Sequence, residues 1–355
     1  MTQASAKGAG GITRLLIGFS IAWGVFAVLF FLLFGALPAG LEERSGWYLV
    51  AINIIEIIAF AFATVLCFRN TTSSQIISGR GVWIPLGIGM LAFTIGNVFF
   101  ALWGTAFGLD PEASLGDVFY LISYVFLFIG LFQAVFPRRI DLSIGQKLLI
   151  GGIGFSGVAL AYLLNYQVAI AAVPPTAAPP AAILAQAPET PEAAPPVEAP
   201  PVESPPAEAP PEAPPAEAPA DVTPAEAAPE AELVGEETSS APAWAQAMDN
   251  LFTPFVNIFG LMYVIGDCLL VVIAATLLVA FWGGRYSQSW KLIAVAAFFL
   301  YIADMIFAFY VSRDGYIEGG VWEVFWTLSA LGFALGAAVE YEISQQSRRG
   351  SRRRA

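Results

Sequence analysis

The chain has no histidine among its 355 residues, and this absence removes a broad class of chemistry. Axial haem ligation by histidine, histidine-based proton transfer and histidine metal sites are all excluded. Only two cysteines are present, Cys67 and Cys268, and both fall inside long apolar segments. A thiol in that setting usually serves as a small packing residue. We therefore predict no disulfide, no metal site and no bound cofactor.

Recognisable catalytic motifs are lacking as well. The sequence contains no phosphate-binding glycine loop, no HExxH, no GxSxG with partner residues and no CxxC. Conventional hydrolase, redox and nucleotide chemistry therefore has no support in the sequence. We predict no catalytic residue, and we expect no nucleic-acid partner.

Charged residues are scarce, at 12%, whereas hydrophobic residues reach 57% and the mean hydropathy is +0.69. Soluble domains carry about twice that share of charge. About 20 apolar residues in a helix cross the roughly 30 Å hydrocarbon core of a bilayer. We predict an all-α polytopic membrane protein whose first span is retained rather than cleaved. Its eight transmembrane helices are expected at 14–36, 47–68, 83–106, 117–137, 147–170, 255–281, 290–311 and 320–341.

Segments in the second half of the sequence also resemble segments in the first half. RLLIG at 14–18 recurs as KLLIG at 147–151, and DVFYLISYVFLFIG from Asp117 matches EVFWTLSALGFALG from Glu323. We predict two four-helix repeats. Because four is an even number, both copies insert in the same sense and are parallel. The predicted repeats cover 13–137 and 145–170 plus 251–342.

Basic residues predict the orientation of the chain. Of the 16 Lys and Arg residues, only Arg44 and Arg313 fall on one side of an eight-span arrangement. The positive-inside rule then places both termini in the cytoplasm, with tails at 1–12 and 343–355. We expect a bacterial inner-membrane protein. The arginine cluster after Ser347 suits anionic lipid headgroups.

One insertion differs sharply from the rest of the chain. Residues 171–248 hold 20 of the 25 prolines, and 14 of the 28 acidic residues lie between Glu189 and Asp249. Repeats of Pro, Ala and Glu cannot form a packed core and favour extended polyproline II. We predict a disordered extracytoplasmic linker. It serves either as a spacer or as a tether to the cell wall or to a membrane or extracytoplasmic protein.

Polar residues inside the predicted spans are the main candidates for function. Glu56 and Asp267 occupy equivalent places in the second helix of each repeat, and Asn97 and Asp304 do so in the third. Tyr301 lies one helical turn before Asp304. A buried carboxylate costs at least about 2.5 kcal/mol in a membrane, and no predicted span has a basic residue in its interior.

These acids must therefore be protonated, bind a cation, face water or accept hydrogen bonds from Asn, Ser, Thr, Tyr or Trp. We predict that they respond to a ligand or a proton. The alternative is a structural role, with interhelical hydrogen bonds worth about 0.6 kcal/mol each. Asn53, on the same face as Glu56, is expected to bond to it.

Other polar and aromatic positions have simpler explanations. Ser114 and Asp117 fit a capping box, and Glu323 follows two glycines at a helix start. Glycines in the fifth and last spans, including Gly332 and Gly336, predict close helix packing within the bundle or between protomers of a homo-oligomer. We expect an interfacial aromatic belt that includes Trp47, Trp103, Tyr120, Tyr310, Trp322 and Trp326.

The segment DVFYLISYVFLFIG and the preceding turn LDPEAS resemble the multi-span sensory modules found ahead of GGDEF or histidine-kinase domains in bacteria. The resemblance implies detection of a membrane or extracytoplasmic signal. No output domain follows RRRA, so a separate partner would have to supply the output.

Three functions are therefore compatible with the sequence. The first is a non-enzymatic sensor-like or scaffold bundle that binds a membrane or extracytoplasmic ligand or partner. The second is a channel or carrier for a small solute, a cation or a proton that uses the intramembrane carboxylates. The third is an intramembrane enzyme with paired carboxylates as acid and base, which needs two acids within reach of one substrate.

Overall fold

The computed structural model describes residues 2–37, 44–73, 76–109, 114–135, 142–171, 241–281, 287–313 and 315–352, and every regular element in these ranges is helical. Eight segments are long and apolar enough to cross a membrane, which confirms the predicted all-α polytopic fold with eight spans. The protein is a multi-pass membrane protein. The spans are Gly11–Phe34, Gly46–Thr72, Arg80–Phe107, Leu115–Val135, Ile144–Leu164, Ala243–Ala280, Gln288–Val311 and Val321–Gln346.

The first four spans are built from α1 (Thr2–Phe34), α2 (Gly46–Thr72), α3 (Arg80–Ala101) and α4 (Leu115–Val135). Helix α3 continues into a π-helix at Leu102–Phe107. This segment ends at Gly108, whose φ of 63° is left-handed and is easily adopted only without a Cβ atom.

The remaining helices are α5 (Ile144–Ala171), α6 (Ala243–Phe252), α7 (Val256–Ala280), α8 (Ser287–Val311) and α9 (Val324–Arg352). Short 3-10 turns at Thr253–Phe255 and Val321–Glu323 precede α7 and α9. Helices α1 and α9 extend beyond the predicted span limits, so the expected tail boundaries at 12 and 343 fall inside helices. The end of an apolar run does not have to end a helix.

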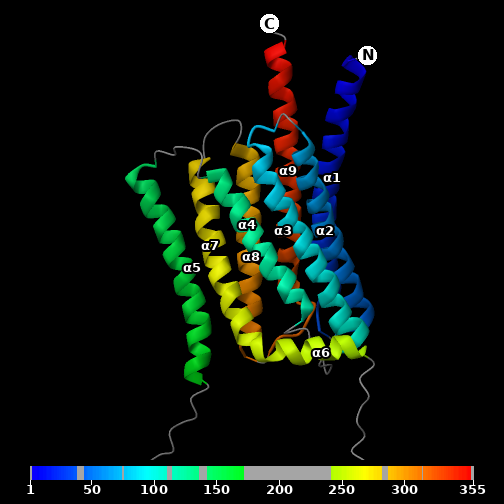
Figure 1. Cartoon of the computed structure of the whole chain (residues 1–355), viewed down its shortest axis with the longest axis vertical. Helices are drawn as coiled ribbons and strands as arrows, with labels where there is room; N and C mark the ends of the chain where they lie inside the picture. Colours follow the sequence, from blue (N-terminus) through cyan, green and yellow to red (C-terminus); the bar gives the residue numbers. More distant parts are fainter. Residues whose placement is uncertain are drawn as a thin grey trace, which may run out of the picture. The chain divides into compact units, whose positions relative to one another are not determined.

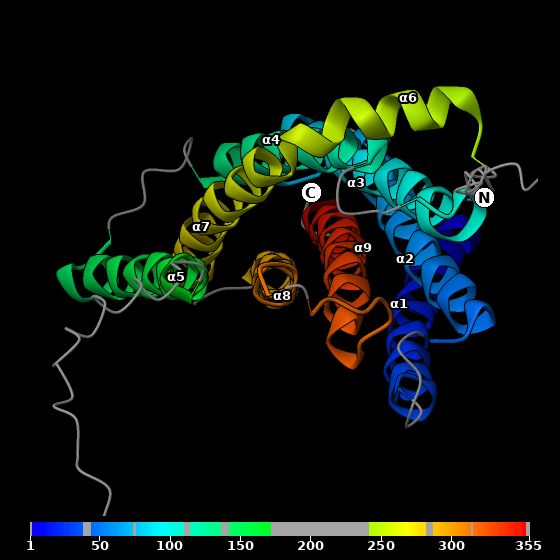
Figure 2. The ribbon, with the colours of Figure 1, turned by 90° about the horizontal axis from the view of Figure 1, so that it is seen from below.

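The helices pack in a reciprocal order. The fourth helix of each predicted repeat, α4 or α9, packs against the third helix of its own half and the second helix of the other half. Figure 2 shows α8 and α9 on the inner side of a curve formed by α5, α7, α4, α3, α2 and α1. The first helices differ, because α1 packs mainly on α9 whereas α5 packs on α7. The sequence repeat itself stays a prediction.

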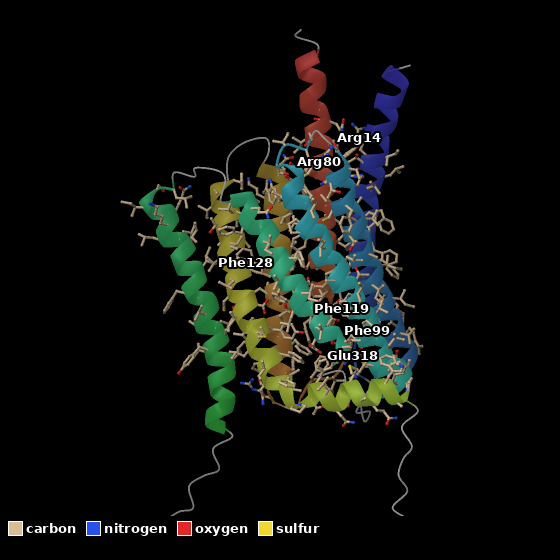
Figure 3. All side chains as sticks on the ribbon, in the orientation of Figure 1. Arg14, Arg80, Phe99, Phe119, Phe128 and Glu318 are labelled. Atoms are coloured by element: carbon tan, nitrogen blue, oxygen red, sulfur yellow. The ribbon has the colours of Figure 1, made fainter. Side chains whose placement is uncertain are left out.

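The two ends of the bundle carry different elements. Helix α1 begins and α9 ends at one end, whereas α5 ends and α6 begins at the other (Figure 1). Arg14 and Arg80 lie toward the end with the termini, and Glu318 lies toward the α6 end (Figure 3). The cytoplasmic location of the termini remains a prediction.

Helix α6 lies across the end of the bundle (Figure 2) and was not expected as a separate element. It begins at Ala243, inside the range predicted for the linker, while residues 172–240 of that linker lie outside the described residues. Trp103, which is fully buried, donates its indole N–H to Asp249 Oδ1 at 3.0 Å. The Trp244 ring packs edge-on against Trp103 and Phe107. These contacts dock α6 to the end of α3.

Close helix packing is present between α8 and α9. A Cβ atom added at Gly332 would lie 2.7 Å from the Ala296 Cβ, and one at Gly336 would lie 2.5 Å from Ile293 Cγ1. The glycine pair therefore serves packing within the bundle. In contrast, a Cβ atom at Gly151 on α5 would meet nothing within 4 Å.

Candidate functional site

A cavity of about 1000 Å³ lies inside the bundle. Residues from α2, α3, α4, α5, α7, α8 and α9 line it, and it reaches the α6 end of the bundle at Asn257 and Ser312. No Lys or Arg is among the described residues that line it. Its lining includes six carboxylic acids and five tyrosines: Glu56, Asp117, Asp267, Asp304, Glu318, Glu323, Tyr120, Tyr124, Tyr162, Tyr263 and Tyr316.

The first polar cluster joins α2, α3 and α4. Asn97 donates its amide N–H to Glu56 Oε1 at 2.9 Å and accepts the Tyr120 hydroxyl at Oδ1 at 2.8 Å. The side-chain amide of Asn97 therefore relays a hydrogen bond from the phenol to the carboxyl group. The structure brings together Glu56 and Asn97, which the sequence singled out separately.

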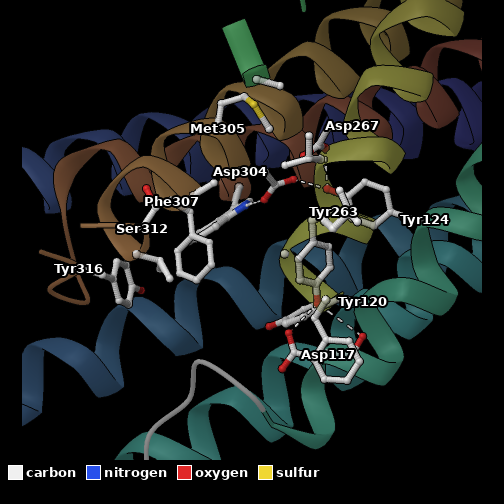
Figure 4. Close-up of a pocket in the computed structure, with 18 of the residues that line it drawn as sticks. Asp117, Tyr120, Tyr124, Tyr263, Asp267, Asp304, Met305, Phe307, Ser312 and Tyr316 are labelled. Atoms are coloured by element: carbon white, nitrogen blue, oxygen red, sulfur yellow. Dashed lines mark hydrogen bonds between the residues drawn. The ribbon is translucent and has the colours of Figure 1, made fainter. Parts of the chain in front are cut away.

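The second polar cluster joins α4, α7, α8 and α9. The Tyr124 hydroxyl lies 2.7 Å from Asp267 Oδ1 and also contacts Asp304 Oδ2. Trp326 donates its indole N–H to Asp304 Oδ1 at 2.7 Å. Figure 4 shows Asp267 and Asp304 approaching Tyr124 together. The two predicted acids of the second half thus share one partner from the first half.

The geometry of this cluster sets a minimum number of protons. A phenol has one proton and can donate it to only one acceptor, yet the Tyr124 oxygen contacts both carboxyl groups. The second contact needs a proton from one of the acids. No Lys or Arg in the described part of the chain lines the cavity to balance two buried carboxylates, and such a pair is strongly unfavourable in a low dielectric. For both contacts to be hydrogen bonds, at least one of the two acids, Asp267 or Asp304, has to be protonated.

Asp267 has unused hydrogen-bonding capacity. Its side chain is completely buried, and its Oδ2 accepts no hydrogen bond within the described part of the chain. The Asp304 carboxyl group lies within hydrogen-bonding reach of the Asp267 carboxyl group.

Glu318 forms a third acidic position, on the segment between α8 and α9. The sequence suggests that Asn53 bonds to Glu56. In the structure, Asn53 instead donates its side-chain amide N–H to Glu318 Oε1 at 2.8 Å. Burial raises the pKa of Glu318, and the Asn53 hydrogen bond opposes this change by favouring the carboxylate. Arg44 fixes the segment by donating to the carbonyls of Ile317 and Glu318 at 3.0 and 2.9 Å.

Asp117 and Glu323 cap the starts of helices. Asp117 Oδ2 accepts the backbone N–H of Ser114 at 2.7 Å, and the Ser114 hydroxyl accepts the N–H of Gly116 at 3.1 Å. Glu323 accepts the N–H groups of Gly319 and Gly320. Both acids also line the cavity.

Tyr301 does not join the site. Its hydroxyl donates to the Gly157 carbonyl of α5 at 3.0 Å, and its ring packs in a small cluster with Ala161, Val271 and Met305. The residue lies one helical turn before Asp304 but points to a neighbouring helix. It holds α5 against α8 and does not line the cavity.

Sequence reasoning missed the aromatic donors. Trp103, Tyr120 and Trp326 were assigned to an interfacial belt, but each donates a hydrogen bond to a polar side chain inside the protein. Trp47, which is 58% exposed, fits the belt. Tyr124 was not singled out at all. The spacing of four between Tyr120 and Tyr124, within a very apolar segment, was the available signal.

No protein-family model, curated protein or solved structure matches this chain. The cavity is the feature that bears on function, because its acids can accept hydrogen bonds, balance a cation or exchange a proton.

Proposed function

We propose that the protein is a non-enzymatic, sensor-like membrane receptor that binds a small molecule within its helix bundle. The observation that carries this proposal is the cavity of about 1000 Å³, whose wall combines aromatic rings with convergent polar groups. Small-molecule sites commonly have this size and this mixture. A scaffold bundle would not require an internal space of this kind.

A purely structural role for the acids is less well supported. Groups kept only to hold helices together are expected to have their hydrogen bonds satisfied inside the protein. Asp267 Oδ2 accepts none among the described residues, although it is fully buried. This unpaired acceptor belongs to a residue that lines the cavity, which favours a ligand.

The proposed binding direction follows from the predicted orientation. The cavity reaches the α6 end of the bundle through Asn257, Ser312 and Glu318. If the termini are cytoplasmic, as the basic residues indicate, a ligand enters from the extracytoplasmic side or from the outer leaflet.

A cavity-filling variant tests the proposal. Gly260 lines the cavity, and a Cβ atom there would meet nothing within 4 Å. We expect Gly260→Trp to fold and to occupy the space. Mass spectrometry of protein purified gently from native membranes should then detect a small molecule that wild type retains and this variant loses.

Gly151→Trp is the matched control, because Gly151 also has open space around it but does not line the cavity. It should retain the same molecule as wild type. Identical small-molecule content in all three proteins would contradict the receptor proposal.

A carrier for a cation or proton is the second candidate. The observation that favours it is the approach of Asp267 and Asp304 to one hydroxyl group, that of Tyr124, because buried acids that exchange protons are the usual coupling element of transporters. Proteoliposomes with an internal pH dye test it under an imposed pH gradient. Proton flux that Asp304→Asn abolishes would place the carrier ahead of the receptor. The same acid pair keeps an acid–base enzyme open, for which product formation from membrane lipids is the test.

A further inference from the structure

We infer that the cavity binds an organic monocation with an apolar body, and that the cation takes the place of one proton held by the pair Asp267 and Asp304. This inference rests on the proposed binding function and specifies its ligand. The reaction is an exchange: the cation enters, one proton leaves, and the summed charge is conserved. No bond other than the carboxyl O–H is broken.

The charge of the wall determines the sign of the ligand. Six acids and no Lys or Arg line the cavity among the described residues. The two basic residues expected near this end, Arg44 and Arg313, are engaged elsewhere. Arg44 donates to backbone carbonyls, and Arg313 lies over the Phe309 ring and donates to the Phe309 carbonyl. An acidic concave site of this kind concentrates cations and repels anions.

The shape and the apolar wall favour an organic cation over a metal ion. No group of three or more acids, cysteines or histidines in the described residues is close enough to hold a metal. In contrast, aromatic rings stand beside the acid pair, including Tyr124 with Tyr263 at 5.8 Å and Phe307 with Trp326 at 5.8 Å between ring centroids. Aromatic faces attract organic cations and also cover their apolar parts.

Asp267 supplies the position for the charge. It is completely buried, and its Oδ2 lacks a donor within the described part of the chain. A cation at this oxygen would balance the second carboxylate and so release the proton that the pair otherwise requires. Tyr124 and Trp326 would continue to donate to the carboxylates.

The groups around the pair offer no other counterion. Among the described residues, the neighbouring titratable groups come from α2, α4, α5, α7, α8 and the segment before α9, and all are neutral or acidic. They are Glu56, Asp117, Tyr120, Tyr124, Tyr162, Tyr263, Cys268, Tyr301, Tyr316, Glu318 and Glu323.

The test uses probes that carry no proton of their own. Benzyltrimethylammonium and tetraphenylphosphonium are permanent cations, so any proton released on binding comes from the protein. Titration calorimetry of the full chain in nanodiscs of zwitterionic lipid, in two buffers of different ionisation enthalpy, counts the protons. Neopentylbenzene and benzenesulfonate serve as neutral and anionic comparisons.

We expect both cations to bind and to release about one proton for each cation bound. While the pair is protonated, their affinity should increase up to about tenfold for each unit by which the pH rises. Asp267→Asn should reduce cation affinity at least tenfold and abolish proton release. Asp249→Asn, whose side chain lies outside the cavity, should change neither. Because the pH dependence is measured on wild type, the result does not depend on the folding of a variant.

The outcomes separate this inference from the receptor proposal. Cation binding without proton release would overturn the inference. So would a neutral or anionic probe that binds as tightly as the cations and is blocked by Gly260→Trp. Either result would still be compatible with the receptor proposal. Failure of both cations to bind would also overturn it. The receptor proposal falls with it only if wild type and Gly260→Trp also retain the same small molecules from native membranes.

Discussion

Tyr120 and Tyr124 lie one turn apart on α4, and their hydroxyl groups serve different acidic clusters. Tyr120 donates to Asn97, which in turn bonds to Glu56 in the first half of the chain. Tyr124 contacts Asp267 and Asp304 in the second half. One face of one helix thus links the polar centres of both halves, and any change that shifts α4 affects both.

Removing the bridging hydroxyl should be costly. Tyr124→Phe keeps the ring but leaves two buried carboxyl groups without their common partner. We expect a loss of about 1 to 3 kcal/mol of stability, seen as a lower thermal unfolding midpoint in detergent. Tyr120→Phe should cost less, because Asn97 still donates to Glu56.

Tyr310→Phe is the control for this pair, since the Tyr310 ring stacks on Trp322 near the surface and the change removes only its hydroxyl. Its midpoint should match wild type. Equal midpoints for Tyr124→Phe and Tyr310→Phe would show that Tyr124 does not bridge the acids.

The docking of α6 should depend on one hydrogen bond. Trp103→Phe keeps an aromatic ring against Trp244 but removes the indole N–H that binds Asp249. We expect faster amide hydrogen exchange in Ala243–Phe252, with little change in α7. Trp47→Phe, at a 58% exposed position, should leave this exchange unchanged. Exchange that is equally slow in both variants would mean that other contacts hold α6.

Glu318 should make stability depend on pH. Burial raises its pKa, so the folded state binds a proton more tightly than the unfolded state. Its contribution is therefore most favourable at low pH and is lost as the pH rises through the folded-state pKa. Glu318→Gln removes this loss and keeps an acceptor for Asn53.

We expect Glu318→Gln to unfold about 1 to 3 °C above wild type at pH 8 and at the same temperature as wild type at pH 4. Thermal unfolding across this pH range provides the measurement. Glu342→Gln, on the exposed surface of α9 near its end, is the control. A Glu318 variant that follows the wild-type curve at every pH would contradict the prediction.

Close packing of α9 on α8 should tolerate no added volume at its glycines. Gly336→Ala places a methyl group against Ile293, and Gly332→Ala places one against Ala296. Each should cost about 1 to 3 kcal/mol. Gly151→Ala, in open space on α5, should be neutral or stabilising, because alanine favours helix. Unfolding midpoints that rank the three variants otherwise would count against this packing.

Much of the fold could be predicted because membrane spans have a simple physical signature. Long apolar runs with few charged residues identified all eight spans. The depth of Glu56, Asp267 and Asp304 followed from the same runs. Helix α6 was not predicted, because its ten residues, Ala243–Phe252, directly follow the proline-rich segment and are too few to cross a bilayer.

The acidic residues of the candidate site could be predicted from the sequence, but their hydrogen-bond donors could not. Acidic residues stand out in an apolar span, but their donors do not, because Tyr and Trp suit the membrane interface equally well. Helical spacing placed Tyr301 beside Asp304 on one face without stating which neighbour each would meet. Asn53 likewise shares a face with Glu56 but reaches Glu318. Contacts between helices depend on rotation and packing, which no single span specifies.

Trp326 holds Asp304 from the first turns of α9, and this helix runs without interruption to Arg352. At 1.5 Å per residue, the two positions are about 40 Å apart along one rigid rod. A tilt or a rotation of α9 that begins at the acid pair would therefore move the arginine-rich end of the same helix, at the other end of the bundle, without any other element having to transmit it.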